Sequence, residues 1–194
     1  MWIVIPCYNE EKRLDEREVE RLLGDGRVNI LFVNDGSSDG TGALLTRLAD
    51  RHPDRIRVLE LEHNGGKGEA VRRGLLEALS RGVPGDVVGF FDADFATPPE
   101  ELPLLLDAMQ SKGAKVALGA RIARLGAHVE RSAVRHYVGR IFATAASTVL
   151  NLSVYDTQCG AKLFRDVPAL RAAVAVPFRS RWAFDVELIG RLLA

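Results

Sequence analysis

Residues 87–94 read VVGFFDAD, and this stretch decides the fold. The run Val87–Phe91 has the length and apolar composition of a strand in a hydrophobic sheet. Asp92 and Asp94 follow directly, and the alternation of an extended chain points both carboxylates the same way. Mg²⁺ is typically held by one or two carboxylates together with substrate phosphates. We therefore expect a cation or phosphate site at a strand end; the alternative is a helix-capping turn before Pro98-Pro99.

The same pattern recurs on both sides of this stretch. Apolar runs of strand length, each followed by Gly, Pro, Asn or Asp, lie at Trp2–Ile5, Ile30–Val33, Ile56–Leu61 and Val116–Leu118. Helical patterns between the strands cover Thr41–Ala49, Glu69–Leu79 and Pro99–Met109. Strands that alternate with helices predict an α/β fold with a mostly parallel sheet flanked by helices, and such sheets bind ligands at the carboxyl ends of their strands.

The pattern changes after Leu118. A basic loop leads into an amphipathic segment at residues 134–149, which predicts a helix whose apolar side favours core packing over lipid contact. Residues 156–165 predict a loop and a short strand, and residues 182–193 predict a final helix. That helix has no C-terminal stop signal, so we expect the natural chain to continue. We expect residues 1–194 to form a single domain.

Composition limits the class of protein. The chain is 47% hydrophobic and 27% charged, as in ordinary globular proteins. Its net charge of zero hides an asymmetry, because residues 1–110 carry 13 basic and 21 acidic side chains whereas residues 111–194 carry 13 and 5. The basic part suits phosphates or an anionic membrane face, while the acidic part argues against a nucleic-acid partner.

Targeting features are weak in this sequence. The first residues lack the basic flank and cleavage site of a signal peptide, and no stretch approaches the roughly 18 apolar residues of a membrane span. We expect a cytoplasmic protein, in contact with a membrane at most peripherally. Cys7 and Cys159 are expected to be free thiols.

Polar or glycine-rich clusters follow four of the predicted strands. In chain order they are Pro6-Cys7-Tyr8-Asn9-Glu10, NDGSSDGT at residues 34–41, NGGKG at residues 64–68, and Asp92-Ala93-Asp94. The third cluster offers backbone N–H groups and an ammonium to a phosphate, although a flexible turn would read the same way. Asp35 is suited to accept a hydrogen bond from a nucleobase N–H or to form an Asx turn, and Ser38 or Asp39 is expected to cap the helix that follows, with Asp39 favoured.

Taken together, these clusters resemble the family 2 glycosyltransferases of the GT-A fold. The resemblance extends over essentially the whole chain, and DTQCGAKLF at 156–164 and RWAFDVEL at 181–188 resemble the dolichyl-phosphate β-glucosyltransferase and mannose synthase branch. It implies an inverting, metal-dependent transfer of a hexose to a polyprenyl or dolichyl phosphate. The residues after Asp94 depart from the mannose branch, which favours glucose from UDP-glucose as the donor.

The resemblance also implies a donor half at residues 1–118 and an acceptor half at 119–194. In the donor half, the implied nucleotide-sugar contacts are Pro6, Tyr8, Glu10, Asp35, Gly66, Lys67, Asp92 and Ala93, and Asp94 would ligate Mg²⁺ or Mn²⁺. In the acceptor half, Gln158 would face the sugar and Asp185 takes the position of a candidate base. A phosphate acceptor is already ionised near neutral pH, so Asp185 would then serve for positioning more than for deprotonation.

The arginines of the basic loop and of the start of the helix predicted after it remain open to two interpretations. Arg121, Arg131 and Arg135 either receive an acceptor phosphate or cover the donor diphosphate, or they simply face solvent. Three other functions compete with transfer to a lipid phosphate. They are a family 2 transferase with a saccharide hydroxyl as acceptor, a nucleotidyltransferase that releases pyrophosphate, and a catalytically silent nucleotide-sugar binding module.

Overall fold

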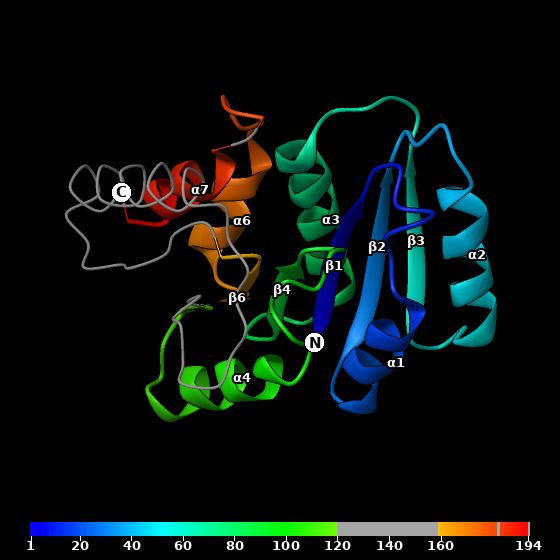
Figure 1. The fold of residues 1–194 in the computed structure, drawn as a ribbon. Coiled ribbons are helices and arrows are strands. Elements are labelled where there is room, and N and C mark those ends of the chain that lie inside the picture. Colours follow the sequence, from blue (N-terminus) through cyan, green and yellow to red (C-terminus); the bar gives the residue numbers. More distant parts are fainter. Residues whose placement is uncertain (120–158, 182, 194) are drawn as a thin grey trace, which may run out of the picture.

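The computed structural model describes residues 1–119, 159–181 and 183–193 (Figure 1). These residues contain a sheet of six strands in the order β3-β2-β1-β4-β6-β5. The strands are β1 (Trp2–Cys7), β2 (Asn29–Asp35), β3 (Ile56–Leu61), β4 (Val87–Phe91), β5 (Val116–Leu118) and β6 (Ala161–Arg165). The first four are parallel, whereas β6 runs antiparallel to both of its neighbours. The predicted α/β fold with a mostly parallel sheet is confirmed.

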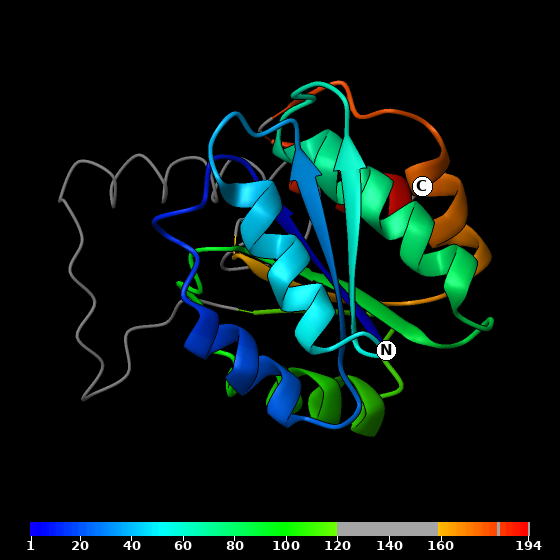
Figure 2. The ribbon, with the colours of Figure 1, turned by 90° about the vertical axis from the view of Figure 1, so that its right-hand side faces the viewer.

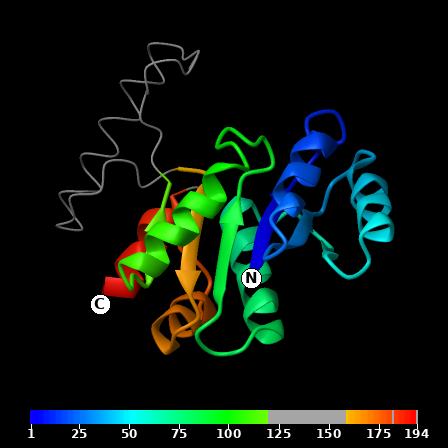
Figure 3. The same cartoon turned by 90° about the horizontal axis from the view of Figure 1, so that it is seen from below.

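Helices cover both faces of this sheet. One face packs against α1 (Glu16–Gly24), α2 (Thr41–Arg51) and α4 (Glu101–Ser111), and the other packs against α3 (Lys67–Arg81), α6 (Pro168–Ala175) and α7 (Phe184–Leu193). Alternation along β1 decides which side chains go where, because Ile3 and Ile5 join the first core and Val4 joins the second. Figure 2 shows β2 and β3 ending at the same edge of the sheet, and Figure 3 shows α3 and α4 on opposite sides of β4.

Some predicted boundaries are wrong. Helices α1 and α6 were not predicted, and α3 begins at Lys67 instead of Glu69. The N-cap of α2 is Gly40, not Ser38 or Asp39. The Asp39 carboxylate nevertheless accepts a hydrogen bond of 3.0 Å from the Thr41 N–H, two residues ahead, as in an Asx turn.

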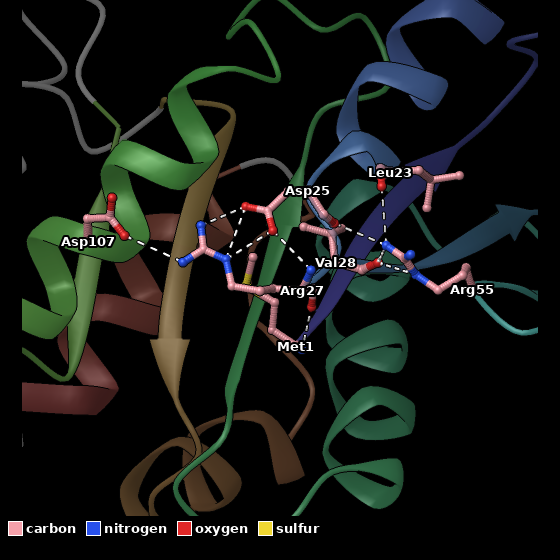
Figure 4. Close-up of polar contacts among 7 residues, drawn as sticks. All are labelled: Met1, Leu23, Asp25, Arg27, Val28, Arg55 and Asp107. Atoms are coloured by element: carbon pink, nitrogen blue, oxygen red, sulfur yellow. Dashed lines mark hydrogen bonds and ion pairs between the residues drawn. The ribbon is translucent and has the colours of Figure 1, made fainter.

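The amino-terminal edge of the sheet is tied together by two arginines (Figure 4). Arg27 pairs with Asp25 at 2.7 Å and reaches Asp107 of α4 at 3.5 Å. Arg55 donates to the backbone carbonyl of Leu23 in the last turn of α1 and to those of Asp25 and Val28 in the connection to β2. These contacts fix the edge opposite to the one at which parallel sheets bind ligands.

The predicted helix at 134–149 lies outside the described residues, as do Gln158 and the three candidate arginines Arg121, Arg131 and Arg135. Across the parts of the chain that the structure describes, no helix combines the length and apolar character needed to cross a bilayer.

Candidate active site

A cavity of about 400 Å³ opens at the carboxyl ends of the parallel strands. It gathers nine residues that the sequence predicted for donor and metal binding: Pro6, Tyr8, Glu10, Asp35, Gly66, Lys67, Asp92, Ala93 and Asp94. Cys7, Arg13, Asn64 and Ala70 complete the lining without having been predicted as site residues. Clusters separated by up to 88 positions in the chain therefore meet at one place, because parallel strands end at the same edge.

The loop after β1 supplies one wall of the cavity. The Glu10 N–H donates to Thr41 Oγ1 at 2.8 Å, which attaches this loop to the start of α2. Arg13 donates two hydrogen bonds to the Glu10 carboxylate, from Nε at 2.9 Å and from Nη2 at 2.5 Å. A guanidinium has five N–H donors, so this bidentate pair leaves Arg13 with donors to spare at the mouth of the cavity. The spacing of three residues between Glu10 and Arg13 was the signal in the sequence that could have identified the pair.

The loop after β3, residues 64–68, which we call the glycine loop, is held by Asp35, the residue predicted to bind the nucleobase. Asp35 is 3% exposed, and its two carboxylate oxygens accept the Gly65 and Gly66 N–H groups at 2.8 Å each. Gly66 has a φ of +87°, a region that favours glycine. Asp35 therefore organises the glycine loop, and because each carboxylate oxygen has two lone pairs, it keeps acceptor capacity toward the cavity.

Asp92 and Lys67 meet across the cavity floor. Lys67 Nζ lies 2.7 Å from Asp92 Oδ2, while Asp92 Oδ1 is buried and has no hydrogen-bond partner among the described residues. Burial raises the pKa of the Asp92 carboxyl above its ordinary value, Lys67 acts to lower it, and the neighbouring Asp94 raises it further. Gly160 approaches closely from the start of β6, because a Cβ there would lie 2.6 Å from Asp92 Oδ2.

These two carboxylates fit a divalent cation. Asp94 is exposed to the cavity, and its Oδ1 accepts from the Ala96 N–H at 3.0 Å. A cation that prefers oxygen ligands would reduce the repulsion between the two carboxylates and would give the unpartnered oxygen of Asp92 a positive charge nearby. The described residues contain no cluster of three or more His, Cys, Asp or Glu that would hold a metal without help from a ligand. Such a site resembles Mg²⁺ sites that substrate phosphates complete.

Asp185 does not line the cavity. It is buried at the start of α7, and its Oδ2 lies 3.0 Å from Lys162 Nζ on β6. Lys162 is fully buried, donates to the Cys159 carbonyl at 2.6 Å, and lies 4.8 Å from the centre of the Phe90 ring. A carboxylate held in this way is a poor candidate for a freely accessible base. The lysine within the otherwise apolar run AKLF could have indicated that a buried charge needs a partner, although it does not identify that partner.

The two cysteines are free and buried. Burial raises the pKa of the Cys7 thiol far above its ordinary value, so this thiol stays protonated although its residue lines the cavity. The hydrogen-bond partners of the two thiols among the described residues are the Ile5 carbonyl and the Thr97 hydroxyl, neither of which acts as a base toward a thiol.

The sheet order, the glycine loop and the paired aspartates at the carboxyl edge place the protein in the GT-A class of α/β folds. The profile described as Glycosyl transferase family 2 matches residues 2–169. The chain belongs to this family.

Named relatives agree with that assignment. The chain is 34% identical to dolichyl-phosphate beta-glucosyltransferase of Drosophila melanogaster, over 96% of this chain and 60% of that protein. It is 32% identical to polyprenol monophosphomannose synthase of Mycolicibacterium smegmatis, over 98% of this chain and 71% of that protein. The chain thus spans about three fifths of the length of the Drosophila relative.

Solved structures share the fold at lower identity. S. aureus TarS 1-349 aligns with a TM-score of 0.60 and 18% identity, over 98% of this chain and 54% of that chain. Mannosyltransferase PcManGT from Pyrobaculum calidifontis, in complex with GDP-Man and Mn²⁺, aligns with a TM-score of 0.54 and 20% identity, over 90% of this chain and 45% of that chain.

Proposed function

We propose that this protein is an inverting, metal-dependent glycosyltransferase that moves glucose from UDP-glucose to a polyprenyl phosphate. The observation that carries the proposal is the single cavity that gathers Asp35, Lys67, Asp92 and Asp94. The names of the relatives, which refer to dolichyl-phosphate and polyprenol substrates, support the acceptor class.

The donor binds with its nucleotide between the loops after β1 and β2. Asp35 accepts from the nucleobase N–H with the lone pairs that the glycine loop leaves unused. Pro6, Tyr8 and Glu10 line the same part of the cavity, and Tyr8 is 46% exposed, so its ring is available to cover a base. Asp92 and Ala93 meet the ribose or the sugar at the floor.

The diphosphate is the leaving group, so its developing negative charge must be stabilised. Asp94 would hold a Mg²⁺ or Mn²⁺ ion, which would supply positive charge to stabilise this leaving group. The solved mannosyltransferase PcManGT, which shares the fold, contains Mn²⁺ together with GDP-Man. Lys67 lies at the first position of α3, where its ammonium and the helix N-terminus both favour an anion. In the absence of donor its charge is balanced by Asp92.

Transfer breaks the bond between the anomeric carbon and the diphosphate oxygen and forms one bond to an acceptor oxygen on the opposite face. A phosphate acceptor is already anionic, so no proton needs to be removed. This requirement agrees with a buried and paired Asp185, which serves for positioning. Gln158 and the arginines Arg121, Arg131 and Arg135 lie outside the described residues. On the resemblance to the family, we propose Gln158 as a sugar contact and the arginines as ligands of the acceptor phosphate, at the cytoplasmic surface of a membrane that the protein contacts peripherally.

The test is UDP release from UDP-glucose with Mn²⁺ or Mg²⁺, measured with and without a short polyprenyl phosphate and with GDP-mannose as a control donor. We expect release to rise with the lipid phosphate and a glucosyl lipid to form. Release stimulated by a saccharide alone would point to a hydroxyl acceptor, and release of pyrophosphate would point to a nucleotidyltransferase. Donor binding with no turnover under any of these conditions would leave only a silent binding module.

A further inference from the structure

Arg181, from the loop before α7, reaches the glycine loop more than a hundred residues earlier in the chain. Its Nε donates to the Gly65 carbonyl at 3.0 Å, and its Nη2 donates to both the carbonyl and the side-chain oxygen of Asn64 at 3.1 Å. In return, the Gly68 N–H donates to the Arg181 carbonyl at 3.2 Å. Figure 2 shows the loop after β3 and the loop before α7 running close together at the top of the view.

The glycine loop is therefore held from two sides. Asp35 accepts the N–H groups of Gly65 and Gly66 from one side, and Arg181 binds carbonyls of the same loop from the other. The fit is close, since a Cβ on Gly66 would lie 2.9 Å from Arg181 Nε. Lys67 follows Gly66 directly in the chain, so the position of this loop determines where the Lys67 side chain starts and whether its ammonium reaches Asp92.

The loop that carries Arg181 is itself anchored to α7. The Glu187 carboxylate accepts from the N–H groups of Arg179 and Ser180, at 2.8 and 3.4 Å. Arg191 pairs with Glu187 at 2.7 Å and donates to the Pro177 carbonyl, also at 2.7 Å. The backbone that carries Arg181 is thus held in place by α7. A side chain that positions another loop needs such support.

We propose that Arg181 is a positioning residue of the donor site, which holds the glycine loop so that Asp35 and Lys67 can meet a nucleoside diphosphate. The inference rests on the function proposed above. It also means that the donor half at residues 1–118 is completed by a residue from the half expected to serve the acceptor.

The test compares Arg181→Ala and Arg181→Lys with Arg179→Ala as the matched control. Arg179 is an exposed arginine of the same loop, and its guanidinium makes no hydrogen bond to the described residues. Amide hydrogen exchange of residues 64–68 is measured in the free protein, and UDP affinity is measured with Mn²⁺. Exchange in the free protein does not depend on which donor the enzyme uses, so a failure of this inference can be told apart from a failure of the proposed function.

We expect Arg181→Ala to speed exchange at residues 64–68 and to weaken UDP binding by about tenfold each, because three hydrogen bonds to a charged donor are lost. Arg181→Lys should show smaller changes in exchange and in UDP affinity than Arg181→Ala, because a lysine ammonium can replace only some of the hydrogen bonds that the guanidinium donates. Arg179→Ala should change neither.

Two results would overturn the inference. Unchanged exchange at residues 64–68 in Arg181→Ala, with UDP binding lost, would mean that Arg181 touches the donor directly. Faster exchange with unchanged UDP affinity would mean that the position of the loop does not matter to the donor site. Arg181→Lys tests the same two outcomes if Arg181→Ala does not fold.

Discussion

At the residue scale, the cavity is dominated by two carboxylates in different surroundings. Asp92 is largely buried, has an unpartnered oxygen among the described residues, and shares its second oxygen with Lys67. Asp94, two positions later, is exposed and also lines the cavity. This asymmetry suits a division of labour in which Asp94 holds the cation and Asp92 shapes the floor.

Asp94→Ala tests that division. We expect it to abolish the part of UDP binding that depends on Mn²⁺, a loss of about tenfold or more, because Asp94 is the cavity carboxylate that remains accessible to a cation. Isothermal titration of UDP with and without Mn²⁺ measures the effect. Asp107→Ala, which removes an exposed carboxylate on α4 far from the cavity lining, is the control. Affinity in Asp94→Ala equal to the wild type would remove the metal assignment.

The Lys162–Asp185 pair leads to a prediction about stability. Removing one partner of a buried ion pair leaves an uncompensated charge, which costs about 3–5 kcal/mol. We expect Asp185→Asn to lower the free energy of unfolding in urea by about that amount, and the double variant Lys162→Met, Asp185→Asn to recover a large part of it. Arg17→Gln, which breaks the exposed pair with Asp15, should change stability by less than about 0.5 kcal/mol. If Asp185→Asn had the same free energy of unfolding as the wild type, the pair would contribute nothing to stability, and Asp185 would again be a candidate for the base.

At the scale of elements, α3 is pressed closely onto the sheet. Gly74 makes this possible, because a Cβ there would lie 2.3 Å from Val4 Cγ1 and 2.8 Å from Val33 Cγ2. The same helix begins with Lys67 and follows the glycine loop, so its depth on the sheet helps to place the site.

Gly74→Ala is expected to lower the free energy of unfolding by about 2 kcal/mol, since the added methyl group overpacks a filled interface. Gly24→Ala is the matched control at the last residue of α1, where no atom lies within 4 Å of a Cβ. Alanine is the better helix former, so the control should be neutral or slightly stabilising. Urea unfolding of both variants decides the point, and equal stabilities would mean that the backbone of α3 can move away from β1 at little cost.

Elements with strong periodicity were predictable, and those without it were not. The strands and α2, α3, α4 and α7 follow from apolar runs and helical spacing. Helix α1 was missed because EREVERLLG is mostly charged and buries only Val19, Leu22 and Leu23. The gathering of the candidate site residues in one cavity was predictable, because parallel strands share an edge. The partners of Lys162 and Arg181 could not be predicted from the sequence. Lys162 contacts a residue 23 positions away and Arg181 contacts one more than a hundred positions away, and no local sequence pattern identifies such partners.

At the scale of the whole molecule, the division at residue 118 does not separate two independent bodies. Strand β6 comes from the second half of the chain and lies between β4 and β5, which come from the first. Phe184 of α7 packs in the same core as Phe90 of β4, with ring centres 5.7 Å apart. The acidic and basic parts of the sequence are thus built into one sheet. The loop before α7 also contacts the glycine loop, whose Asn64 and Gly66 line the cavity.

This construction predicts that a donor ligand stabilises the whole protein in one transition. At a hundredfold excess over its Kd a ligand adds about 2.7 kcal/mol, which for a chain of this size raises Tm by roughly 5–10 °C. We expect UDP with Mn²⁺ to produce such a shift equally in far-UV circular dichroism and in tryptophan fluorescence. Asp94→Ala should lose the part of the shift that requires Mn²⁺. Two separate transitions, of which UDP moves only one, would show instead that the donor half folds without β6 and α7, and that the contact between Arg181 and the glycine loop does not join the two ends of the chain into a cooperative unit.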